Sequence, residues 1–193
     1  MSGIASSPVV LILASGRGER FRASGGGVHK LQAPLGGVPV LQRTLDAVRA
    51  SGLPWHLEQA THPGMGDSIA AAVRATRAAP GWLVLPADLP LVLPQTLRQV
   101  ADALRAGAMV ARPVFDGAAG HPVGFGPACG EALAQLSGAQ GAAPVLQAQR
   151  RAGGLQELVV DDAGVVSDID TVDDLARAEA LWRARHPQRT DPG

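Results

Sequence analysis

The amino-acid sequence predicts an α/β fold: a single three-layer domain in which helices cover both faces of a mostly parallel sheet. Strand-like and helix-like segments alternate along the chain, which is the pattern of parallel strands joined by crossover helices. Residues 9–14 and 82–86 are continuous apolar runs, as expected for strands buried on both faces. The 193 residues, 46% of them apolar, show neither an internal repeat nor a long linker, so we expect one domain with a substantial core.

The first half of the chain is predicted to alternate strand and helix from its first apolar run onward. After the strand at 9–14, residues 40–51 place apolar side chains on one helical face, and Gly52 and Pro54 end this helix. Pro94 is a favourable first-turn residue for a later helix. The remaining elements of this half are a weak strand at 55–60, a helix at 67–78, the strand at 82–86 and a helix at 95–105.

The second half is predicted to contain a β-hairpin insertion, two short helices, a strand and a closing helix. The strands at 108–114 and 120–125 are expected to pair through the Asp116–Gly117 turn, since Asp-Gly is a strong hairpin signal. Thr171 and Asp174 have the spacing of a capping pair at the start of the last helix. The other predicted elements are helices at 127–136 and 144–151, a strand at 155–160 and the closing helix at 171–185.

Composition and charge exclude several classes of function. Seventeen basic and seventeen acidic residues cancel, which argues against a general binder of nucleic acids or of membrane surfaces. Three Phe, three Trp and no Tyr leave little for stacking on bases. The single cysteine, Cys129, forms no internal disulfide and suits a reducing compartment, so we expect a cytoplasmic protein. Neither a signal peptide nor an apolar run of roughly 18 residues is present, so we expect no membrane partner.

A glycine-bearing loop with separated cations follows the first predicted strand. Gly16 and Gly18 allow backbone amides to approach a phosphate closely, and Arg17, Arg20 and Lys30 supply positive charge. The loop fits neither the dinucleotide fingerprint, whose third glycine is replaced by Phe here, nor the phosphate-loop pattern, which needs Ser or Thr after the lysine. A basic surface loop is the simpler alternative. The buried strand before the loop favours polyphosphate binding, because such strands aim their loops at the ligand edge.

Carboxylates follow two other predicted strands. Asp88 comes directly after the strand at 82–86, and Asp168 and Asp170 follow the strand at 155–160. Because ligands of parallel α/β sheets bind at the carboxyl ends of the strands, these side chains and the basic loop are expected at one edge. Carboxylate oxygens hold Mg²⁺ against phosphates. The alternatives remain open: Asp88 caps a turn, Asp168 replaces Asp170 as ligand, or the later acidic group serves only the helix dipole.

Five segments resemble the molybdenum-cofactor nucleotidyltransferases, the MobA-like NTP transferases, in the order expected of that family. The first runs from Leu13 to Arg20, with Lys30 downstream, and the others lie further along the chain. Within the family, the sequence is most similar to the cytidylyltransferase branch and to accessory proteins of molybdenum hydroxylases. The remaining four segments are Gly64-Met65-Gly66-Asp67-Ser68-Ile69, Pro86-Ala87-Asp88-Leu89-Pro90, Gly120-His121-Pro122-Val123 and residues 168–175.

The resemblance implies a Rossmann-like domain of the nucleotide-diphospho-sugar transferase type over residues 1–186. The sequence itself predicts a disordered C-terminal tail at 187–193. It implies an Mg²⁺-dependent transfer of CMP from CTP to molybdopterin with release of pyrophosphate, in the maturation of molybdenum hydroxylases. The implied partners are CTP or another NTP, molybdopterin and an apo-molybdoenzyme, with Mg²⁺ as the cofactor. The acceptor's terminal phosphate is already ionised near neutral pH, so positioning and charge neutralisation suffice for the reaction.

The resemblance also assigns a role to each candidate site residue. Arg20, Lys30 and Asp88 are the catalytic residues, and Asp88 and Asp170 are the metal ligands. His121 and Pro122 would contact the acceptor. The nucleotide-binding residues would be Leu13, Ala14, Ser15, Gly16, Arg17, Gly18, Lys30, Gly66 and Ser68.

Two departures from the family pattern keep other functions open. Ser15 stands where Ala or Gly is usual, which leaves the choice between CTP and GTP undecided, and the loop from residue 21 to residue 29 is longer than usual. A non-catalytic chaperone for the molybdenum cofactor and an NAD(P)H-dependent reductase on the same fold are the alternative functions. His29, His56, His62 and His186 form no constellation that the sequence reveals.

Overall fold

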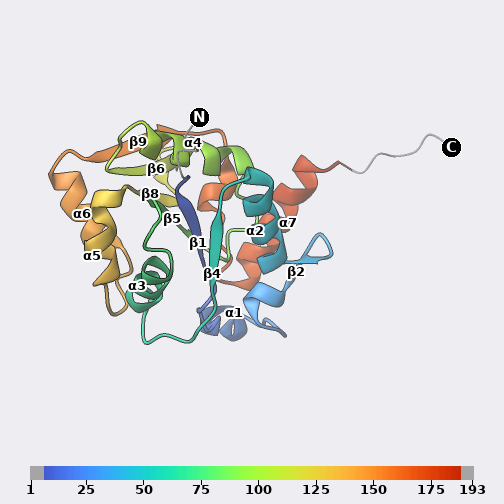
Figure 1. Ribbon diagram of the computed structural model, residues 1–193. Coiled ribbons are helices and arrows are strands. Elements are labelled where there is room, and N and C mark those ends of the chain that lie inside the picture. Colours follow the sequence, from blue (N-terminus) through green and yellow to red (C-terminus); the bar gives the residue numbers. More distant parts are fainter. Residues whose placement is uncertain (1–6, 188–193) are drawn as a thin grey trace.

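The computed structural model describes residues 7–187 and contains a seven-stranded central sheet between two sets of helices (Figure 1). The strands follow the order β4-β1-β5-β8-β6-β7, and β9 pairs with β6. The last six residues of the predicted tail lie outside the described residues. The strands of this sheet are β1 (Val9–Leu13), β4 (Trp55–Glu58), β5 (Trp82–Pro86), β6 (Val110–Phe115), β7 (Ala118–Ala119), β8 (Val123–Phe125) and β9 (Leu155–Val159).

The helices alternate with these strands as the sequence predicts. The helix predicted at 67–78 begins two residues earlier and ends three residues earlier than expected, while the helix at 40–51 has the expected bounds. None of the helices within residues 7–187 is long and apolar enough to cross a membrane. The α-helices are α1 (Glu19–Ala23), α2 (Val40–Ser51), α3 (Met65–Ala75), α4 (Pro94–Arg105), α5 (Gly130–Ala134), α6 (Ala143–Arg151) and α7 (Val172–Arg185).

The sheet is mainly parallel and carries the predicted hairpin insertion. Strands β4, β1, β5, β6 and β9 run in one direction, whereas β7 and β8 run antiparallel to their neighbours. The Asp116–Gly117 turn joins β6 to β7, with a positive φ at both residues. The chain then returns as β8, which pairs Phe125 with Val110 and inserts between β5 and β6. The predicted pairing of the two segments is therefore confirmed.

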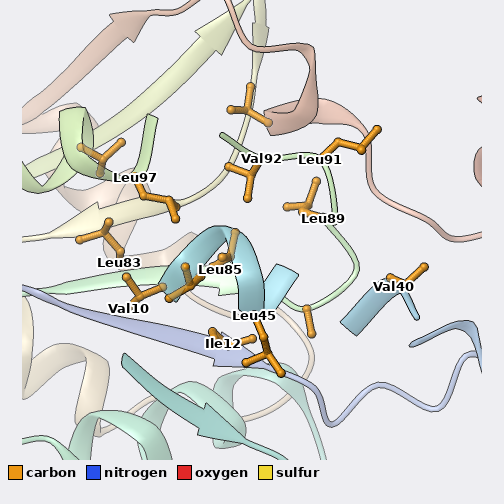
Figure 2. Packing of buried hydrophobic residues seen from close by; sticks show 14 of the residues in the cluster. Val10, Ile12, Val40, Leu45, Leu83, Leu85, Leu89, Leu91, Val92 and Leu97 are labelled. Carbon is orange, nitrogen blue, oxygen red and sulfur yellow. The ribbon is translucent and has the colours of Figure 1, made fainter. Parts of the chain in front are cut away.

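Each face of the sheet has its own hydrophobic core. Side chains alternate along a strand, so Val10 and Ile12 of β1 belong to the core beneath α2 and α4, whereas Leu11 and Leu13 belong to the core beneath α3 and α5. Figure 2 shows Val10 and Ile12 together with Leu45 of α2 in the first of these cores. The helices lie on opposite sides of the sheet in Figure 1, with α3, α5 and α6 on the left and α2 and α7 on the right. The three-layer prediction is confirmed.

Several small elements have no counterpart in the sequence prediction. The short helix α1 lies in the basic loop, and its Phe21 is 2% exposed, which anchors the loop to the core. The strands β2 (Pro34–Leu35) and β3 (Val38–Pro39) form a separate two-stranded hairpin. The described part of the chain also contains three 3₁₀ turns: η1 (Lys30–Gln32), η2 (Pro127–Cys129) and η3 (Ala163–Val166).

Two acidic residues stabilise the carboxyl-terminal elements through hydrogen bonds. Asp174 and Thr171 form the predicted capping box at the start of α7. Asp162 is 1% exposed and accepts hydrogen bonds from three segments of the chain, so it joins α4, η3 and α7. Its donors are Leu93 N at 2.8 Å, Thr96 Oγ1 at 2.7 Å, Gly164 N at 2.9 Å and a guanidinium nitrogen of Arg185 at 3.0 Å.

Candidate functional site

A cleft of about 780 Å³ lies at the carboxyl ends of β1, β4, β5 and β9. This is the edge at which open α/β sheets bind their ligands. The wall combines loops that are far apart in the sequence, and three of its side chains are basic while four are acidic. The charged residues of the wall are Arg17, Arg20 and Lys30 on the one hand and Glu19, Asp88, Asp168 and Asp170 on the other.

The loop after β1 is held over this cleft by its own backbone conformation and by a histidine. Gly18 has a φ of 63°, in the left-handed region that favours glycine, and α1 begins directly after it. A ring nitrogen of His29 lies 2.9 Å from the carbonyl oxygen of Gly16. Because the far end of the loop thereby contacts its start, Arg17 and Arg20 stand at the cleft with exposed side chains.

Lys30 lies at the centre of the site, between two carboxylates. Its Nζ is 2.6 Å from Asp88 Oδ2 and 2.8 Å from Asp170 Oδ1, and only 12% of its side chain is exposed. Arg20 contacts the other oxygen of Asp170 at 2.6 Å. Burial alone would lower the pKa of Lys30, but the charge of Asp88 and the hydrogen bonds that Lys30 donates to both carboxylates outweigh it and raise that pKa. Lys30 is therefore a permanent cation at neutral pH.

The Asp88 carboxylate has one oxygen that Lys30 does not satisfy. Asp88 Oδ1 is buried and has no hydrogen-bond partner among the described residues. A buried, unpaired carboxylate oxygen is costly unless a ligand occupies it. Hard divalent cations prefer such oxygens. Within residues 7–187, no three His, Cys, Asp or Glu side chains gather as a metal site. Mg²⁺ fits this arrangement, because it is usually bound through one or two carboxylates plus substrate phosphates and water.

The cleft wall also carries a histidine and a third aspartate. Burial lowers the pKa of His121, although the charge of Asp88 opposes this, so the ring is neutral at pH 7. Its Nδ1 is buried without a hydrogen-bond partner in the described part of the chain. Burial also raises the pKa of Asp168, and the charges of Asp88 and Asp170 add to the rise. Ala118, Ala119, Val165 and Val166 give this half of the cleft an apolar wall.

Most of the residues singled out from the sequence meet at the cleft, and four do not line it. Ser68 is fully buried and its hydroxyl is 2.6 Å from that of Ser15, so it lies behind the wall rather than in it. Gly66 packs against the backbone of Ser137, where a Cβ would lie 2.7 Å from the carbonyl oxygen. Close packing therefore requires this glycine. Those at the cleft are Leu13, Ser15, Gly16, Arg17, Gly18, Arg20, Lys30, Asp88, His121 and Asp170, whereas Ala14, Gly66, Ser68 and Pro122 are not part of its wall.

The structure also gathers residues that the sequence analysis left apart. Glu58 lies at the end of β4, with His62 Nε2 at 3.2 Å and His56 Nε2 at 3.6 Å from its carboxylate. His62 lines the cleft. The contact between His56 and Glu58 could be predicted from their spacing, because residues two apart on a strand lie on the same face. The position of His62 depends on the loop after β4, for which the sequence carries no comparable rule.

Comparison with known proteins identifies the family. The model of the MobA-like NTP transferase domain matches residues 46–153, more than half of the chain. Among curated proteins, the bifunctional protein GlmU of Coxiella burnetii is 30% identical over 115 residues, which cover 48% of this chain. The match covers 25% of GlmU, so the chain spans about a quarter of the length of that relative.

Solved structures with the same fold cover nearly the whole chain. Rv0371c from Mycobacterium tuberculosis aligns at 25% identity over 91% of this chain and 98% of its own, with a TM-score of 0.73. A nucleotidyl transferase from Methanothermobacter thermautotrophicus aligns at 21% identity over 93% and 99% of the two chains, with a TM-score of 0.77. Molybdopterin-guanine dinucleotide biosynthesis protein A from Archaeoglobus fulgidus aligns at 19% identity over 91% and 99%, with a TM-score of 0.60.

Two further neighbours were solved with ligands. A second structure of Rv0371c is a complex with manganese, and it aligns at 23% identity over 90% and 98% of the two chains with a TM-score of 0.70. CMP:2-keto-3-deoxy-manno-octonic acid synthetase was solved with CTP, and it aligns at 16% identity over 93% and 100% with a TM-score of 0.61. On the match to the family model, this chain belongs to the MobA-like NTP transferase family.

Proposed function

We propose that this protein is an Mg²⁺-dependent nucleotidyltransferase that transfers CMP from CTP to molybdopterin and releases pyrophosphate. The observation that carries the proposal is the position of Lys30 between Asp88 and Asp170, with Arg20 beside Asp170. Cations for a triphosphate and carboxylates for its metal stand within one cleft at the ligand edge of the sheet. A protein that only binds a pterin has no need of this combination.

In this reaction, an oxygen of the acceptor's terminal phosphate attacks the α-phosphorus of the nucleotide. A new P–O bond forms while the bond between the α-phosphorus and the bridging oxygen of the β-phosphate breaks, and pyrophosphate leaves with that oxygen. The attacking phosphate is already ionised at neutral pH, so no side chain has to remove a proton. Arg20 and Lys30 would stabilise the negative charge that develops on the leaving pyrophosphate, and the Gly16 and Gly18 amides would position the phosphates.

Asp88 and Asp170 would hold Mg²⁺, and the bound ion would neutralise charge on the α-phosphate and the leaving group. The unpaired Oδ1 of Asp88 supports this assignment, because no described residue satisfies that oxygen. The balance of charges on the cleft wall also supports a bound cation. Four carboxylates face three basic side chains, so the triphosphate meets a favourable field only together with a cation.

The apolar half of the cleft supports an acceptor with a flat, partly apolar body. His121 is neutral, and Ala118, Ala119, Val165 and Val166 line the cleft beside it. A fused heterocycle such as that of molybdopterin fits a wall of this kind. The neighbours solved with manganese and with CTP support a metal-dependent, CTP-using enzyme, and the molybdopterin-guanine dinucleotide protein supports the acceptor.

The test has a binding part and a catalytic part. Thermal shifts are measured with CTP, GTP, ATP and NADPH, each with and without Mg²⁺. The proposal expects the largest stabilisation with CTP plus Mg²⁺, while stabilisation by NADPH alone favours the reductase and contradicts the proposal. Pyrophosphate release is then followed with molybdopterin and CTP in the wild type and in Asp88→Asn. Absence of release in the wild type, with the cofactor still bound, favours the chaperone function.

A further inference from the structure

We infer that Thr44, a residue of α2 outside the cleft wall, is a positioning residue for the metal-binding carboxylate of Asp88. Its side chain is fully buried. The hydroxyl lies 2.8 Å from the carbonyl oxygen of Ala87 and donates to it, whereas the carbonyl of Val40, one turn back in the same helix, is 3.3 Å away. The shorter bond thus leaves the helix and reaches the loop after β5.

The bond acts on the peptide plane that aims Asp88. The carbonyl of Ala87 and the amide of Asp88 belong to one rigid peptide unit, so fixing this carbonyl limits rotation at the Cα that carries the carboxylate. The peptide units before and after this one are also fixed by hydrogen bonds. Ala87 N donates to Leu13 O at 3.0 Å, and Ile169 N donates to Asp88 O at 3.0 Å. Thr44 therefore supplies the middle restraint of three, and it is the one that comes from a side chain.

A hydroxyl at this place is not what helix formation or packing favours. Threonine is a weaker helix former than alanine, leucine or methionine, because its β-branch is restricted in a helix. Valine has nearly the same shape and suits the apolar surroundings formed by Val40, Leu45 and Val48 of the same helix. What valine lacks is the donor for Ala87. The loop could then turn its carbonyl elsewhere, and the two oxygens of Asp88 would lose their fixed direction.

This role rests on the proposed function, since it concerns metal held by Asp88. Residues that orient metal ligands typically change metal affinity by about 10- to 100-fold when they are substituted. The test measures Mn²⁺ affinity by electron paramagnetic resonance, in the presence of CTP and without an acceptor. The variants are Thr44→Val, Thr44→Ser and Ser51→Ala, each with its thermal unfolding temperature.

Ser51→Ala is the matched control. Ser51 is also a buried hydroxyl of α2, and it donates to Val48 O at 2.6 Å, at the end of the helix away from Asp88. The inference expects a loss of about 10-fold in Mn²⁺ affinity for Thr44→Val, with near wild-type affinity for Thr44→Ser and for Ser51→Ala. Unchanged affinity in Thr44→Val, or an equal loss in Ser51→Ala, overturns it. Failure of the wild type to bind Mn²⁺ with CTP overturns the proposed function as well.

Discussion

Replacing Lys30 by methionine tests the charge network at the centre of the site. The substitution keeps the apolar stem and removes the ammonium that lies 2.6 Å from Asp88 and 2.8 Å from Asp170. At an effective dielectric constant of about 20, each of these contacts is worth roughly 6 kcal/mol before desolvation is counted. Removing one member of a buried pair costs about 3–5 kcal/mol, because the remaining charges stay buried and repel each other.

Because both carboxylates remain partly exposed to solvent, we take the lower end of this range and expect a loss of about 3 kcal/mol in the free energy of unfolding. For a domain of this size, that lowers the unfolding temperature by about 6–12 °C. The arrangement also predicts a difference in the response to metal. In Lys30→Met, Mg²⁺ can neutralise both carboxylates, so a concentration ten times the dissociation constant restores about 1.4 kcal/mol. In the wild type, Lys30 already neutralises part of this negative charge, so Mg²⁺ alone stabilises the protein less.

The assay is differential scanning fluorimetry of both proteins with no ligand, with Mg²⁺ and with Mg²⁺ plus CTP. Arg183→Met is the control, because it removes an exposed ion pair with Glu179 in α7 and is expected to cost less than about 1 kcal/mol. Two results would refute the reasoning: no loss of stability in Lys30→Met, or equal stabilisation of the wild type and Lys30→Met by Mg²⁺ alone.

Three further predictions concern the framework around the cleft. Asp162→Asn removes the charge that four donors share and should cost about 2–3 kcal/mol in urea unfolding; a loss below 0.5 kcal/mol, on the order of a surface change, would contradict this. Gly66→Ala forces a Cβ against Ser137 and should cost about 1–3 kcal/mol. Loss of nucleotide affinity without loss of stability would show that phosphate approach is the reason for this glycine instead. Glu58→Gln should destabilise at pH 7 and have a smaller effect at pH 3: burial alone would raise the pKa of Glu58, but His62 and neighbouring donors hold it below its ordinary value. The carboxylate's stabilisation is therefore present above about pH 4.3 and disappears as pH falls through the lowered pKa. An equal difference between the two proteins at pH 3 and pH 7 would contradict this assignment.

The elements with strong local signals could be predicted from the sequence. The strands at Val9–Leu13 and Trp82–Pro86 are unbroken apolar runs because both of their faces are buried, and that pattern has few alternatives. The Asp116–Gly117 turn and the Thr171 capping box carry their own residue preferences. The meeting of the basic loop with the acidic residues was also predictable, because parallel strands direct their following loops to one edge.

What the sequence did not predict depends on contacts between distant segments. Lys30 reaches Asp170 across 140 positions, and no local pattern specifies that one ammonium lies between two carboxylates. Gly66 fits a phosphate-binding interpretation equally well until the backbone of Ser137 is seen against it. The hydroxyl of Thr44 is another example, since a threonine within a helix gives no sign that it bonds to a different loop.

The most direct test of the central claim is pyrophosphate release from CTP and molybdopterin in the presence of Mg²⁺, measured for the wild type and for Asp88→Asn. The account predicts release in step with formation of the cytidylylated pterin, and a loss of about 100- to 1,000-fold in Asp88→Asn, because Asp88 is the proposed ligand of the ion that neutralises the phosphate charge. Undiminished release by Asp88→Asn, or no release by a wild-type protein that binds CTP and Mg²⁺, would contradict it.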